Sequence, residues 1–120
     1  MNFWRKKEKK IETDQTRGKA DVLNGLSQRS LYFKENIKEH AFFIPEYEVS
    51  KTINLILEGK EVLTEREVTE ILTLLNDIKK VEHYDGSGWY DYQVQLAHFL
   101  RLNGFETEFK DRKLHLAENL

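Results

Sequence analysis

The sequence predicts a mainly α-helical fold: one compact domain of four to five helices that ends in a two-stranded β-hairpin, α+β by strict count. Three observations support this prediction. Apolar residues recur at helical spacing in several stretches between residues 13 and 103. The chain holds one proline and six glycines, which favours long regular elements over loops. After residue 104 the apolar residues alternate with polar ones, which is typical of strands.

The first part of the chain predicts two or three helices. Residues Val22, Leu26, Phe33 and Ile37 follow near-helical spacing from Thr13 onwards. Gly18 and Gly25 weaken this helix, and a break at Asn24-Gly25 would give a second helix over about 26–42. Pro45 suits the first turn of the next helix, which we expect to end before Gly59.

The segment around residues 63–68 carries the clearest local signal. Thr64 and Glu67 form a capping-box pattern, and Leu63 and Val68 are spaced as a hydrophobic staple. We therefore expect a helix over about 65–80. A second helix is expected over 89–103, with Gly104 as its stop signal, and a hairpin over 105–117 that turns at Asp111-Arg112.

Charge divides the chain into an acidic domain, residues 13–120, and a flexible basic tail, residues 1–12. Residues 1–10 have a net charge of +4, whereas the whole chain has −2, so the other 110 residues carry −6. The basic residues of the tail are Arg5, Lys6, Lys7, Lys9 and Lys10. With Phe3 and Trp4 they suggest contact with anionic lipid or nucleic acid, although a solubilising tail is the simpler interpretation.

Several classes of site are excluded by composition. The chain has no cysteine, which excludes disulfides, thiolate nucleophiles and cysteine-ligated metals and favours a cytoplasmic setting. The four histidines lack metal-ligand spacing, so we expect neither a metal nor a cofactor. No signal peptide and no stretch of about 18 apolar residues is present, so we expect no integral membrane segment.

A loop over residues 82–88 concentrates chemically useful side chains, among them His83, Asp85 and Ser87. These residue types serve acid–base and nucleophilic catalysis. Closeness in sequence does not bring side chains together in space, and Gly86-Ser87-Gly88 lacks the spacing of a phosphate loop. We therefore interpret the segment as an interhelical linker and expect a protein that is not an enzyme.

The first functional hypothesis is a non-enzymatic protein-binding module, a small acidic inhibitor, immunity-type protein or regulatory accessory protein of a bacterium or phage. Acidic surfaces speed association with basic partners. Aromatic side chains beside a polar rim are typical of protein interfaces. The expected contact residues are Tyr84, Trp89, Tyr90, Glu58, Glu61, Glu65 and Glu70. Homodimerisation through Phe42-Phe43-Ile44 is a further option.

The alternative hypothesis is a winged-helix-like DNA-binding regulator. Helices over 65–80 and 89–103 followed by a hairpin over 105–117 have the right order, with 89–103 as the recognition helix. The cations available to phosphate are Arg101, Lys110, Arg112 and Lys113. Because the rest of the chain is acidic, this alternative is less favoured.

Overall fold

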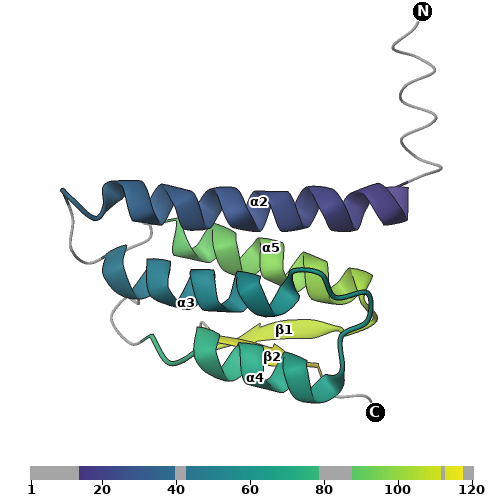
Figure 1. Ribbon diagram of the computed structural model, residues 1–120. Helices are drawn as coiled ribbons and strands as arrows, with labels where there is room; N and C mark the ends of the chain where they lie inside the picture. Colours follow the sequence, from purple (N-terminus) through teal and green to yellow (C-terminus); the bar gives the residue numbers. More distant parts are fainter. Residues whose placement is uncertain (1–13, 40–42, 79–87, 112, 118–120) are drawn as a thin grey trace, which may run out of the picture.

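The computed structural model describes residues 14–39, 43–78, 88–111 and 113–117. In this part the chain forms α2 (Asp14–Asn36), α3 (Phe43–Leu57), α4 (Glu65–Leu75) and α5 (Trp89–Leu102), followed by strands β1 (Thr107–Lys110) and β2 (Lys113–Leu116). Figure 1 shows α2 lying across α3 and α5, with α4 and the hairpin on the far side of α3 and α5 from α2. The predicted mainly α-helical fold with a C-terminal hairpin is confirmed. The tail, residues 1–12, lies outside the described residues.

Helix α2 is continuous, so the break considered at Asn24-Gly25 is wrong. At Gly25 the helix faces the Gln95 side chain of α5. A Cβ on Gly25 would lie 2.2 Å from Oε1 of Gln95, so that flexible side chain would have to shift. The helix ends at Asn36, whose side-chain amide donates to the carbonyl of Tyr32 at 2.8 Å, and so it stops six residues short of the expected end.

Helix α4 begins with the predicted capping box. The Thr64 hydroxyl accepts from the backbone N–H of Glu67, and the Glu67 carboxylate accepts from the backbone N–H of Thr64. The helix ends at Leu75, not near residue 80 as expected. Asn76 is its C-cap and turns its side chain to the hairpin, donating to the carbonyl of Leu114 at 2.8 Å.

Helix α5 ends as the sequence predicts. The N–H of Phe105 donates to the carbonyl of Leu100 and that of Gly104 to Arg101, the paired bonds of a Schellman ending, with Gly104 at φ 93°. The strands then pair antiparallel with Lys110 opposite Lys113. Asp111 has φ 54°, a positive value that is usual at the first central residue of a two-residue hairpin turn.

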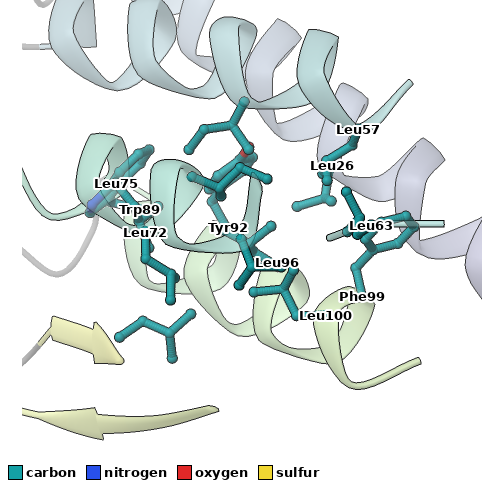
Figure 2. Close-up of a cluster of buried hydrophobic side chains, with 14 of the residues drawn as sticks. Leu26, Leu57, Leu63, Leu72, Leu75, Trp89, Tyr92, Leu96, Phe99 and Leu100 are labelled. Carbon is teal, nitrogen blue, oxygen red and sulfur yellow. The ribbon is translucent and has the colours of Figure 1, made fainter. Parts of the chain in front are cut away.

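The core lies between the four helices (Figure 2), and Leu114 of β2 is one of its buried residues. One end is aromatic: Phe33 packs on Phe43 and Trp89 with ring centroids 5.9 and 5.8 Å apart. A buried polar contact joins α3 to α5, because the Tyr92 hydroxyl donates to Oδ1 of Asn54 at 2.8 Å. The Asn54 amide in turn donates to the carbonyl of Leu26 in α2 at 3.1 Å, so three helices share this contact.

Candidate protein-interaction surfaces

Trp89 is a core residue, which corrects its assignment to a partner-binding surface. Its side chain is 3% exposed and stacks on Tyr92 with ring centroids 5.2 Å apart. Helical spacing places it on the same side of α5 as Tyr92, and that side faces the core. Tyr84, predicted beside it, lies outside the described residues.

Tyr90 is exposed, as expected, with 59% of its surface accessible. Its ring lies 5.5 Å from the ring of Phe109 on β1. Val94 follows one turn later on α5 and is also exposed. We call these three residues, Tyr90, Val94 and Phe109, the α5–β1 surface. The sequence did not single out Val94 or Phe109, because the alternation of the hairpin placed Phe109 on its packed face and gave no sign that it sits at the edge.

The four acidic residues predicted for partner binding are all exposed. Glu58 and Glu61 follow α3, and Glu65 opens α4. The two most exposed large apolar side chains of the described residues, Val62 and Leu55, lie in the same stretch of chain. We call Leu55, Glu58, Glu61, Val62 and Glu65 the α3–α4 surface.

Glu70 continues this acidic region along α4. It lines a shallow surface depression with Glu65, Arg66 and Thr69. Sequence reasoning missed Leu55 and Val62, since both fall outside the apolar stripes that packing requires. For Leu55 a signal was available in the sequence, because an apolar residue that lies off the apolar stripe of its helix faces solvent.

Glu67 differs from its acidic neighbours because it has a structural task. It pairs with the Lys60 ammonium and completes the cap of α4. The hydrogen bond from Lys60 and then that from the Thr64 backbone lower the pKa of Glu67. The carboxylates of the α3–α4 surface take part in no ion pair that joins described residues.

The two surfaces lie toward opposite ends of α4. Tyr90 contacts Phe109, Phe109 pairs with Leu114, and Leu114 binds Asn76 at the end of α4. Glu65 is at the other end of that helix, about 15 Å away along its axis. In Figure 2, Trp89, which precedes Tyr90 in the chain, lies at one side of the core, and Leu63, which follows Val62, lies at the other. The sequence grouped aromatic and acidic residues into one interface, and the structure does not bring them together.

The predicted phosphate-binding cations that the structure describes lie on two elements, Arg101 on α5 and Lys110 with Lys113 on the hairpin. Arg101 is exposed on α5, where its guanidinium contacts Nδ1 of His98 at 2.8 Å. Lys110 and Lys113 face each other across the hairpin, and Lys110 also pairs with Glu108 at 3.5 Å. Arg112 lies outside the described residues. The exposed side of α5 therefore presents Arg101 together with the uncharged Tyr90 and Val94 and the acidic Asp91.

The Phe42-Phe43-Ile44 strip does not form a surface as considered. Phe43 is 2% exposed and belongs to the aromatic end of the core, while Ile44 is exposed and Phe42 lies outside the described residues. The loop residues His83, Asp85 and Ser87 and the basic tail residues also fall outside them. In the ranges that are described, no three histidines or carboxylates are grouped to hold a metal ion. Nor does any helix there combine the length and apolarity that a membrane span requires.

Comparison of the chain with protein-family models, with curated proteins and with solved structures gives no significant match.

Proposed function

We propose that this protein is a non-enzymatic, acidic protein-binding module, acting as a small inhibitor, immunity-type protein or regulatory accessory protein, and that its α3–α4 surface contacts a basic partner. One observation carries the proposal: Val62 and Leu55, 74% and 61% exposed, lie in the same stretch of chain as the exposed carboxylates Glu58, Glu61 and Glu65. An apolar centre within a charged rim is the common anatomy of protein interfaces.

Charge supports a basic partner. Residues 43–78 contain eight aspartates and glutamates and three lysines and arginines, a net charge of −5, whereas the whole chain has −2. A concentrated negative surface raises the encounter rate with a positively charged protein and disfavours acidic ones. Inhibition of a nucleic-acid-binding protein in the cytoplasm would use such a surface, since the carboxylates would occupy the place of phosphates.

The test is affinity capture from a lysate of the native host with two charge-matched variants. The interface variant is Glu58→Gln, Glu61→Gln and Glu65→Gln, and the control variant is Glu35→Gln, Glu39→Gln and Glu106→Gln, all at exposed positions. We expect a basic protein that is retained at low salt, released at high salt and lost from the interface variant alone. Equal capture by both variants would contradict the proposed surface.

A second candidate function is DNA binding, favoured by the observed order of α3, α4, α5 and a hairpin. This is the order of a winged-helix domain, in which α5 would enter the major groove. The exposed side of α5 argues against it, because Tyr90 and Val94 carry no positive charge and Asp91 repels phosphate.

A further inference from the structure

Helix α5 presents a stripe of side chains between α2 and the hairpin. On one side of the stripe, Arg29 of α2 pairs with Asp91 at 3.6 Å, and on the other side Phe109 of β1 packs on Tyr90. The side chains of the stripe are Tyr90, Val94, Ala97 and Arg101, of which Ala97 is half-buried and the others are exposed.

The spacing of these four positions reads the same in both directions. The intervals are four, three and four residues, which is the spacing of the seam where two helices pack along each other. A twofold axis between Val94 and Ala97 would set Val94 of one chain against Ala97 of the other, and Tyr90 against Arg101. The small Ala97 side chain at the centre allows close approach of the two helices.

We propose that the α5 stripe binds a second copy of this chain in antiparallel orientation, as a symmetric homodimer. Charge selects both the partner and the orientation. Arg101 would meet the Tyr90 ring of the other copy, which pairs a cation with an aromatic face, and it would lie near Asp91, which Arg29 pairs within its own chain. A parallel arrangement would instead place Arg101 against Arg101 and Asp91 against Asp91.

This inference does not depend on the proposed function, because the stripe and the α3–α4 surface share no residue. The stripe spans about 16 Å of helix, so the contact is short and the dimer is expected to be weak. Phe109 of each copy extends the apolar contact beyond the two helices, since its ring lies against Tyr90.

Light scattering after size exclusion, over roughly 10 µM to 1 mM protein, tests the association directly. We expect the mass to rise from 14.3 kDa toward twice that value. Arg101→Glu should weaken dimerisation about tenfold because it places like charges together. Arg66→Glu, the same change at an exposed position of α4, should leave it unaltered.

Cysteine pairing tests the geometry, and the absence of native cysteine gives a clean background. Under mild oxidation, a mixture of V94C and A97C proteins should form crosslinked heterodimers in excess over V94C mixed with L55C, a position on α3. Preferential crosslinking of V94C to itself would indicate a parallel pair and overturn the proposal. So would a constant monomer mass with equal crosslinking in both mixtures.

Discussion

The side chain of Asn76 binds both backbone polar groups of Leu114. Its amide donates to the Leu114 carbonyl at 2.8 Å, and its Oδ1 accepts from the Leu114 N–H at 3.4 Å. Asn76 thus takes the place of a neighbouring strand along β2. A two-stranded hairpin is marginal in water by itself, and this contact together with the burial of Leu114 fixes it to the helices.

Replacing Asn76 with alanine should release the hairpin. We expect Asn76→Ala to lower the free energy of unfolding by about 1–2 kcal/mol, since it leaves two half-buried backbone groups of Leu114 without partners. Amide hydrogen exchange at Leu114 should accelerate more than exchange in α2. Asn103→Ala is the control: that side chain donates within α5, to the Phe99 carbonyl, so the hairpin should stay protected.

Removing the Tyr92 hydroxyl should destabilise the contact between α3 and α5. Tyr92→Phe leaves Oδ1 of buried Asn54 without its donor, and we expect a loss of about 1–3 kcal/mol in urea unfolding. Combined with Asn54→Ala, the two losses should be less than additive, because both variants break the same bond. Full additivity would show that the two side chains act independently.

Tyr92 also predicts a loss of stability in alkali. Burial raises the pKa of Tyr92 above its usual value of 10.0. At pH values above 10.0 the unfolded chain releases the tyrosine proton and the folded chain keeps it. The free energy of unfolding therefore falls by up to about 1.4 kcal/mol per pH unit. Wild type should therefore lose more stability than Tyr92→Phe between pH 9 and pH 11, and parallel curves would contradict this.

The cap of α4 predicts sensitivity to acid. Because the folded-state pKa of Glu67 is lowered from 4.5, the unfolded chain binds the proton first as pH falls. The stabilisation by Glu67 is thus complete above its unfolded-state pKa and is lost as pH falls through its folded-state pKa. Glu67→Gln should flatten the acid limb of the stability curve, whereas Glu70→Gln on the same helix should not.

The Thr64 hydroxyl contributes to the same cap at neutral pH. Thr64→Ala should lower the free energy of unfolding by about 1 kcal/mol, measured by chemical denaturation at pH 7.

Two glycines should respond to alanine with opposite signs. A Cβ on Gly18 would meet Leu102 at 3.5 Å, an ordinary contact, so Gly18→Ala should stabilise α2 by about 0.5–1 kcal/mol. Gly88 has φ 87°, and a Cβ there would approach the Arg29 guanidinium at 3.2 Å. Gly88→Ala should therefore cost about 1–2 kcal/mol in chemical denaturation.

The surface of α5 predicts weak contact with DNA. In a gel-shift titration at low salt, random duplex should remain unbound at protein concentrations up to about 10 µM, because the exposed side of α5 neutralises few phosphates. Retardation that Arg101→Gln abolishes would instead establish the winged-helix function.

The elements with strong local signals could be predicted from sequence. The capping box at Thr64 and Glu67, the stop at Gly104 and the alternation of residues 105–116 act over a few residues, so their energies are determined within the segment. Helix ends without such signals were misplaced. At the end of α4, for example, the side chain of Asn76 binds Leu114, which is 38 residues further along the chain.

Sequence by itself determined that this chain folds into amphipathic helices with a terminal hairpin and a surplus of exposed carboxylates, because spacing and charge are properties of the chain. Tertiary structure decided that Trp89 is buried while Tyr90 meets Phe109, that α2 passes unbroken through Gly25, and that the acidic and aromatic surfaces lie apart. These outcomes depend on which helix faces approach one another, and that is decided by packing between segments distant in sequence.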